Sequence, residues 1–177
     1  NYNNKKTYII TPHEWGPIVM FYNFLNSIET EHDNMTITKL LKLRIQDKHD
    51  EVKKKLSDLN EKDRNFVNKI LNGKVDEYLK KLIQKMLTKN KELLEYLSPN
   101  NWANKIKNKV FILHGANDSM VPFTESTSLA SIIPDNKLLI SFLYEHREIS
   151  TNRGILFKIK ELIKMMNYFA FYFRYNE

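Results

Sequence analysis

The chain has 177 residues, enough for a domain with its own core, and 42% hydrophobic and 12% aromatic residues indicate a globular protein rather than a disordered one. It has no cysteine, which excludes disulfide frameworks and thiol nucleophiles and leads us to expect a reducing, cytoplasmic location. The net charge of +7 comes mainly from lysine and forms no basic stripe with interleaved aromatic residues, so we expect no nucleic-acid partner.

The first expected element is a strand over residues 7–11, a β-branched and aromatic run that Pro12 closes. A turn over residues 15–17, which include Gly16 and Pro17, is followed by apolar residues at helical spacing over 18–28. No apolar run in the chain reaches the roughly 18 residues of a transmembrane helix, so we expect no integral membrane segment.

Residues 34–97 have a different pattern. Gly73 is the only glycine among them, and apolar side chains recur at intervals of three and four residues. This periodicity predicts a series of amphipathic helices with breaks near residues 49–50, 60–61, 72–73 and 90. We therefore expect residues 17–100 to form a helical insertion, whose apolar faces either pack on one another or hold an acyl chain.

Strands and helices alternate in the last part of the chain. The pattern predicts strands over residues 110–113 and 138–143, a helix over 123–132 between them, and a final amphipathic helix over 155–172. Together with residues 7–11, this order predicts an α/β fold with a short parallel sheet of three strands. The first strand would have an unpaired edge, which proteins normally avoid.

An acid and an imidazole follow the last two predicted strands. Asp118 lies shortly after strand 110–113, and His146 lies directly after strand 138–143. One right-handed crossover joins these strands, so their carboxyl ends are neighbours and the two side chains should meet. An Asp can orient a His that takes a proton from a nucleophile. Alternatively, Asp118 caps the following helix and His146 is an ordinary loop residue.

Other candidate residues have structural explanations. His13 and Glu14 follow the first predicted strand and either form a turn or face a cleft, whereas His32 and His49 lie among charged residues and are expected on the solvated surface. Ser119 is next to the acid but not on a strand-to-helix elbow, so we do not expect it to be the nucleophile. No metal-binding or phosphate-binding motif is found, and we expect no metal and no cofactor.

The segment HGANDSMVP, which contains Asp118, is followed by a strand and by YEHREI, which contains His146. This arrangement resembles the C-terminal third of the α/β-hydrolase fold, in particular lysophospholipases, monoacylglycerol lipases and small serine esterases. The resemblance implies that Asp118 is the acid and His146 the base of a catalytic triad. It also implies that the three predicted strands are the last three of the sheet and that the helical insertion is a cap. Arg147 departs from the small residue expected after the His.

The nucleophile of this family is missing, because no GxSxG is found and no earlier HG-rich oxyanion-hole loop is present. His114 and Gly115 belong to the acid segment and do not replace that loop. The chain also begins with Asn1 rather than Met. We therefore expect the C-terminal portion of a longer serine hydrolase, with residues 1–16 and 101–177 in the core and 17–100 in the cap.

The expected substrate is a small carboxylic ester, lipid-like forms included, and the expected partner is a missing N-terminal half or another chain at the edge of the first strand. One alternative is a non-catalytic, hydrolase-like interaction module that uses this strand edge and the aromatic end of the chain. Another is a helical protein that binds membrane surfaces through its basic helices.

Overall fold

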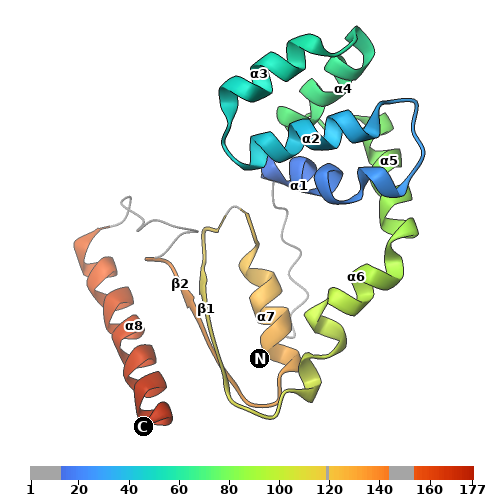
Figure 1. The fold of residues 1–177 in the computed structure, drawn as a ribbon. Coiled ribbons are helices and arrows are strands. Elements are labelled where there is room, and N and C mark those ends of the chain that lie inside the picture. The colour runs from blue at the N-terminus through green and yellow to red at the C-terminus, as the bar shows by residue number, and fades with distance from the viewer. Residues whose placement is uncertain (1–12, 119, 144–153) are drawn as a thin grey trace. The chain divides into compact units, whose positions relative to one another are not determined.

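The computed structural model describes residues 13–118, 120–143 and 154–177, and these form two compact units. The first unit ends at Leu97 and the second begins at Ser98. The expected first strand over residues 7–11 lies outside the described residues. Figure 1 shows that the first unit consists of helices and that the second contains a sheet flanked by helices.

The first unit is made of helices, as the periodicity of residues 34–97 predicts. Its first helix begins at Trp15, earlier than expected, because Pro17 is tolerated in the first turn of a helix and does not interrupt it. A 3-10 turn, η1 (Leu25–Ser27), takes the place of the expected last turn. The α-helices of this unit are α1 (Trp15–Phe24), α2 (Asn34–Ile45), α3 (His49–Asp58), α4 (Glu61–Leu71), α5 (Glu77–Lys89) and α6 (Lys91–Leu97).

Polar side chains define where three of these helices begin. Asp33, Asn60 and Asp76 precede α2, α4 and α5, and each accepts a hydrogen bond from a backbone N–H in the first turn of its helix. Such caps satisfy N–H groups that have no partner within the helix, and each typically contributes about 1 kcal/mol. The breaks expected near residues 60–61 and 72–73 therefore lie beside capped helix starts.

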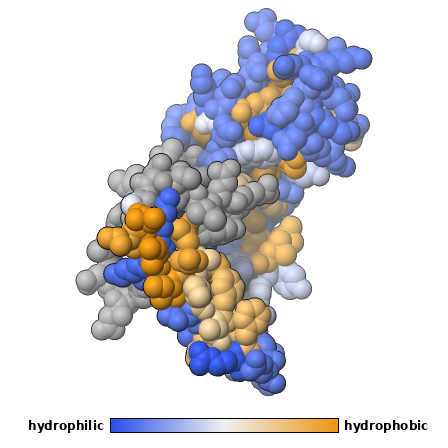
Figure 2. Space-filling view, turned by 90° about the vertical axis from the view of Figure 1, so that its left-hand side faces the viewer, coloured by the Kyte–Doolittle hydropathy of each residue, from blue (hydrophilic) through white to orange (hydrophobic). Residues whose placement is uncertain are grey.

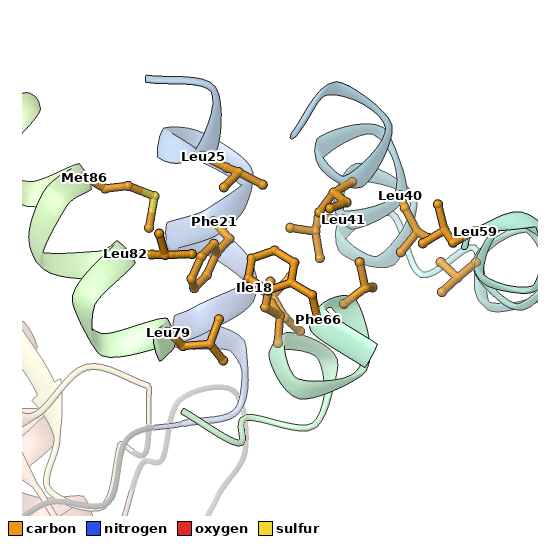
Figure 3. Close-up of a cluster of buried hydrophobic side chains, with 14 residues drawn as sticks. Ile18, Phe21, Leu25, Leu40, Leu41, Leu59, Phe66, Leu79, Leu82 and Met86 are labelled. Carbon is orange, nitrogen blue, oxygen red and sulfur yellow. The ribbon is translucent and has the colours of Figure 1, made fainter. Parts of the chain in front are cut away.

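The core of the first unit is a continuous cluster of apolar side chains around α1 (Figure 3). Helix α1 contacts α2, α4 and α5, so it is central to this packing. Ile18 and Phe21 of α1 are fully buried, and the ring of Phe21 meets that of Phe66 edge to face. The apolar faces of the helices thus pack against one another, the first of the two options that the sequence left open.

Gly73 lies between α4 and α5 in the left-handed region, with φ of +63°. A Cβ atom at this position would be 3.4 Å from the Cα of Glu14. Glycine is therefore favoured both by the backbone angle and by the close approach of the chain before α1.

The second unit contains a parallel pair of strands, β1 (Val110–Gly115) and β2 (Asn136–Ser141), joined through α7 (Phe123–Ile132). Two short 3-10 turns, η2 (Pro99–Asn101) and η3 (Ala103–Lys105), precede β1, and α8 (Ile155–Asn176) ends the chain. The register pairs Val110 with Asn136 and Gly115 with Ser141. Both strands therefore end at the same edge of the sheet.

Helices cover both faces of this sheet. His114 bonds to Ser126 of α7, whereas Phe111 packs against Tyr168 and Tyr172 of α8. Since residues 111 and 114 of a strand point to opposite faces, α7 and α8 lie on opposite sides (Figure 1). The order of layers is helix, sheet, helix, as in α/β folds.

The α/β class is confirmed, with a sheet of two strands in the described part of the chain where the sequence predicted three. Strand β1 extends beyond the predicted 110–113 to Gly115, and β2 lies two residues earlier than the predicted 138–143. Helix α7 has the predicted bounds, and α8 continues past the predicted residue 172 to Asn176. Most residues of the strands are only half-buried, although the strands of parallel sheets are normally well buried.

Candidate active site at the end of strand β1

The residues that follow β1 form a tight loop that leads into α7. The apolar run of β1 ends at His114 and Gly115, and Pro122 then precedes the first residue of α7. The N–H of Asp118 donates to the carbonyl of Gly115, at 3.2 Å, which turns the chain back at the end of the strand. The loop therefore begins at the carboxyl edge, where ligand sites of open α/β sheets are found.

Asp118 is held in this loop by its own side chain. Its Oδ1 accepts hydrogen bonds from the N–H groups of Met120, at 2.8 Å, and Val121, at 3.0 Å. The side chain is 10% exposed, and its Oδ2 lies 3.9 Å from Nε2 of His114. Two backbone donors on one oxygen fix the orientation of the carboxylate, so that the second oxygen has a defined direction.

His114 connects the strand, the loop and the following helix. Its Nε2–H donates to the carbonyl of Val121, at 2.9 Å, and its Nδ1 accepts from the hydroxyl of Ser126 on α7, at 2.7 Å. Both ring nitrogens are therefore engaged, and His114 is suited to hold the Asp118 loop rather than to transfer protons. Sequence reasoning placed His114 in the acid segment but did not find its partner Ser126. The sequence indicates this contact only through the spacing, because His114 ends a strand and Ser126 follows twelve residues later in a predicted helix.

The end of β2 lies beside the start of this loop. The N–H of Ala116 donates to the carbonyl of Ser141, at 2.7 Å, so the two carboxyl ends are directly connected. His146, the predicted base, lies outside the described residues, as does Ser119. The structure thus describes the predicted acid, Asp118, and both strand ends. The meeting of Asp118 with His146 stays a prediction.

A buried carboxylate anchors the chain directly after β2. Glu161 of α8 accepts from the N–H of Phe142, at 3.0 Å, and from the ammonium group of Lys164. Burial raises the pKa of Glu161. These two hydrogen bonds, together with the positive charges of Lys164 and Lys160, outweigh burial and hold the pKa below its usual value. The carboxylate is ionised at neutral pH and fixes the beginning of the segment that carries position 146. No sequence pattern singled out this residue.

The other histidines are placed as follows. Nδ1 of His13 accepts from the N–H of Trp15, at 3.2 Å, which is the predicted turn role. The side chain of His49 is 60% exposed, as expected for a surface residue.

The prediction for His32 was wrong, because its side chain is only 4% exposed. Its Nδ1 lies 2.6 Å from Oδ1 of Asp63, and its ring stacks on Phe66 at 4.0 Å between centroids. The neighbouring charges suggested a solvated position, but the pairing partner is thirty-one residues away and cannot be seen in the local sequence.

Within the described ranges, no group of three or more His, Cys, Asp or Glu side chains is arranged to hold a metal ion. The helices described there also include none that is both long and apolar enough to cross a membrane.

Comparison with known families gives a match to part of the chain. The family model BD-FAE, which describes α/β-hydrolase-like esterase domains, matches residues 52–133. The chain is similar to esterase domains of this kind. The matched segment runs from α3 to just past α7 and includes Asp118, whereas position 146 lies outside it. Nothing in the match is specific to lysophospholipases. No curated protein and no solved structure matches the chain.

Proposed function

We propose that this chain supplies the acid and base of a serine hydrolase that cleaves carboxylic esters. The observation that carries the proposal is the fixed carboxylate of Asp118 at the carboxyl edge of a parallel sheet, within the segment similar to esterase domains. His146 would follow the neighbouring strand and reach Asp118 across the connected strand ends. A lipid-like ester, as in lysophospholipases, is the substrate class that the sequence resemblance favours.

In this mechanism Asp118 accepts a hydrogen bond from one ring nitrogen of His146 and stabilises its protonated form. The other ring nitrogen takes the proton of a serine hydroxyl while the serine oxygen attacks the ester carbonyl. The proton then passes to the leaving alcohol, and water, activated by the same histidine, releases the acid and restores the serine. The serine and the donors for the oxyanion are supplied by residues outside this sequence.

The sheet supports the proposal that further strands belong to this hydrolase. Two strands are few for a parallel sheet, and most side chains of β1 and β2 are only half-buried in the described part of the chain. We propose that residues 7–11 and an N-terminal half of the protein complete the sheet, and that residues 17–100 form the cap. A cytoplasmic location is part of the same proposal, since a chain without cysteine needs no oxidising compartment.

A non-catalytic interaction module is the second candidate, and the surface of α8 favours it. This helix exposes a series of large apolar side chains, which Figure 2 shows as a hydrophobic band along the helix. Contiguous apolar surface of this kind marks interaction sites in soluble proteins. The exposed residues are Ile155, Leu156, Ile159, Leu162, Ile163, Met166, Phe169 and Phe173.

The experiment that tests the hydrolase proposal uses the natural gene product that contains this sequence. It is treated with a fluorophosphonate probe and assayed with a p-nitrophenyl ester. We expect His146→Ala to abolish labelling and Asp118→Asn to reduce kcat by about 10⁴-fold, because the histidine loses its orienting partner.

Asp135→Asn is the matched control, because Asp135 is an exposed carboxylate that pairs with Lys109 at the other end of the strands. It should leave labelling and kcat unchanged. A gene product that is neither labelled nor active, in a folded state, would favour the interaction module. Full activity in the Asp118→Asn variant would refute the assignment of the acid.

A further inference from the structure

A groove in the first unit lies between α5 and the segment that begins at the end of η1. Its volume is about 870 Å³, and the residues that line it are Ser27, Ile28, Glu29, Lys81, Gln84, Lys85, Thr88 and Lys89. All of them belong to the helical unit, so the groove is complete within one compact part of the molecule.

Three lysines form one side of this groove. Lys81, Lys85 and Lys89 follow one another at intervals of four residues, so their side chains project from the same face of α5. Eight helical residues rise about 12 Å, which is the distance along the helix axis from position 81 to position 89. An elongated ligand can therefore contact all three.

The described part of the chain provides no partner carboxylate for these lysines. Within the residues that the structure describes, no ion pair joins any of the three to a carboxylate. Their neighbours differ in this respect: Lys80 pairs with Glu77, and Lys91 pairs with Glu95. Glu29 is the one acidic residue among those that line the groove in the described ranges. Three ammonium groups against one carboxylate leave a local excess of positive charge, which attracts an anion.

The rest of the groove suits an apolar chain with a polar end. Ile28 contributes an apolar, partly buried side chain, and the lysines contribute their methylene stems. The hydroxyl of Ser27 already donates to the carbonyl of Phe24, and that of Thr88 donates to the carbonyl of Gln84. The side-chain amide of Gln84 is a further donor beside the lysines.

We propose that this groove binds an anionic amphiphile, a phosphate or carboxylate group attached to an alkyl chain. The anionic group pairs with the row of lysines, and the alkyl chain lies over Ile28 and the lysine stems. The groove is open along its length, so one elongated ligand can lie in it with its anionic group beside the lysines. The inference does not depend on ester hydrolysis by the Asp118 loop.

The test is calorimetric titration of the full chain with octyl phosphate below its micellar concentration. Inorganic phosphate and octanol serve as separate probes of the head group and the alkyl chain. We expect octyl phosphate to bind more tightly than either. The triple variant K81Q/K85Q/K89Q should bind it about tenfold more weakly, because it loses three exposed charge pairs.

The control is K53Q/K54Q/K55Q, which removes three exposed lysines from α3 and so has the same net charge as the test variant. It should bind octyl phosphate like the parent chain. If the triple variant of α5 does not fold, Lys85→Gln is compared with Lys54→Gln. NMR shifts of the Ser27 and Thr88 amides on addition of octyl phosphate locate the site.

Several results would overturn the proposal. Equal weakening in both triple variants would show general attraction to a basic protein, and octanol binding as tight as that of octyl phosphate would show that charge is irrelevant. Inorganic phosphate binding as tightly as octyl phosphate would assign the groove to a free anion. Binding to vesicles of anionic lipid without binding to octyl phosphate would assign these lysines to a membrane surface.

Discussion

His32 and Asp63 form a buried pair in the helical unit, with side chains 4% and 5% exposed. Asp63 is well satisfied, because it also accepts from the side-chain amide of Asn60 at 2.8 Å. Nε2 of His32, in contrast, is buried with no hydrogen-bond partner among the described residues. The pair therefore joins the loop before α2 to α4 but does not satisfy all of its polar groups.

Removing one member of this pair should destabilise the unit strongly. We expect Asp63→Ala to lower the free energy of unfolding by about 3 kcal/mol, because it leaves the buried imidazole without its partner. The double variant His32→Phe/Asp63→Leu should recover most of the loss, since apolar side chains of similar size need no partner. Urea unfolding followed by circular dichroism measures both. If the double variant were no more stable than Asp63→Ala, the attraction between His32 and Asp63 would exceed the free-energy cost of removing both groups from water.

The same carboxylate makes stability depend on pH. Burial raises the pKa of Asp63. The favourable contacts of its carboxylate, chiefly the hydrogen bonds from His32 and Asn60, together outweigh burial and hold the pKa below its usual value. A carboxyl whose pKa is lower in the folded state stabilises the fold above its unfolded pKa of about 3.9, and this contribution is lost as pH falls through the folded pKa. We therefore expect acid to destabilise the parent chain more steeply than Asp63→Asn below about pH 4. Equal slopes in urea titrations at each pH would contradict this.

At this scale, sequence reasoning found residues with a local signature and missed those with distant partners. Asp118 is recognisable because a strand, a glycine and a proline surround it within a few positions. The contacts of His114 with Ser126 and of Glu161 with Phe142 depend on helices packing on a sheet, which no local pattern specifies.

At the scale of elements, the helices were predicted more accurately than the sheet. Each helix of the first unit carries its own apolar periodicity and, at three starts, its own cap. The strands are short, so their exact ends depend on pairing: β1 extends to Gly115 because Gly115 pairs with Ser141. The expected break at residues 72–73 is also explained by an element boundary, the left-handed turn at Gly73.

The two glycines of the first unit should respond in opposite ways to alanine. Gly73→Ala should lower the free energy of unfolding by about 1–2 kcal/mol, because its φ of +63° is costly for any residue with a Cβ. Gly16 lies in α1, and a Cβ atom there would have nothing within 4 Å, so Gly16→Ala should be neutral or stabilising by up to about 1 kcal/mol. Thermal unfolding measures both, and a harmless Gly73→Ala would show that the turn rearranges.

The apolar face of α8 should bind a hydrophobic dye. We expect Leu156→Lys, Ile163→Lys and Met166→Lys, combined in one variant, to reduce ANS fluorescence at least about twofold, because they interrupt a contiguous apolar surface. Tyr96→Lys changes an exposed residue of α6 in the same way and should have little effect. Unchanged dye binding in the α8 variant would place the dye elsewhere.

At the scale of the whole molecule, the two units differ in how complete their cores are. All members of the main buried apolar cluster lie between Ile18 and Met86. In the described part of the second unit, only Ala103, Ile133 and Tyr168 are buried apolar residues. The helical unit has the packing of an independent domain, whereas the described part of the sheet unit leaves most of its large apolar side chains partly or fully exposed.

We therefore expect residues 13–97 to fold when expressed alone. The fragment should show a helical circular-dichroism spectrum and a cooperative thermal transition, because its core is internal to it. Residues 98–177 expressed alone should bind ANS and unfold without a sharp transition, since few of their apolar side chains are buried. A non-cooperative transition for residues 13–97 would show that this unit needs the rest of the chain.

The division of the chain at Ser98 also separates its two tryptophans. Trp15 packs at the edge of the helical core, with the guanidinium of Arg44 4.5 Å from its ring. Trp102 belongs to the other unit and is 43% exposed. The fluorescence of each indole therefore reports on the unfolding of one unit. With Trp102 replaced by phenylalanine, intrinsic emission follows the melting of the bundle inside the intact polypeptide, and the reciprocal replacement of Trp15 isolates the signal of the sheet.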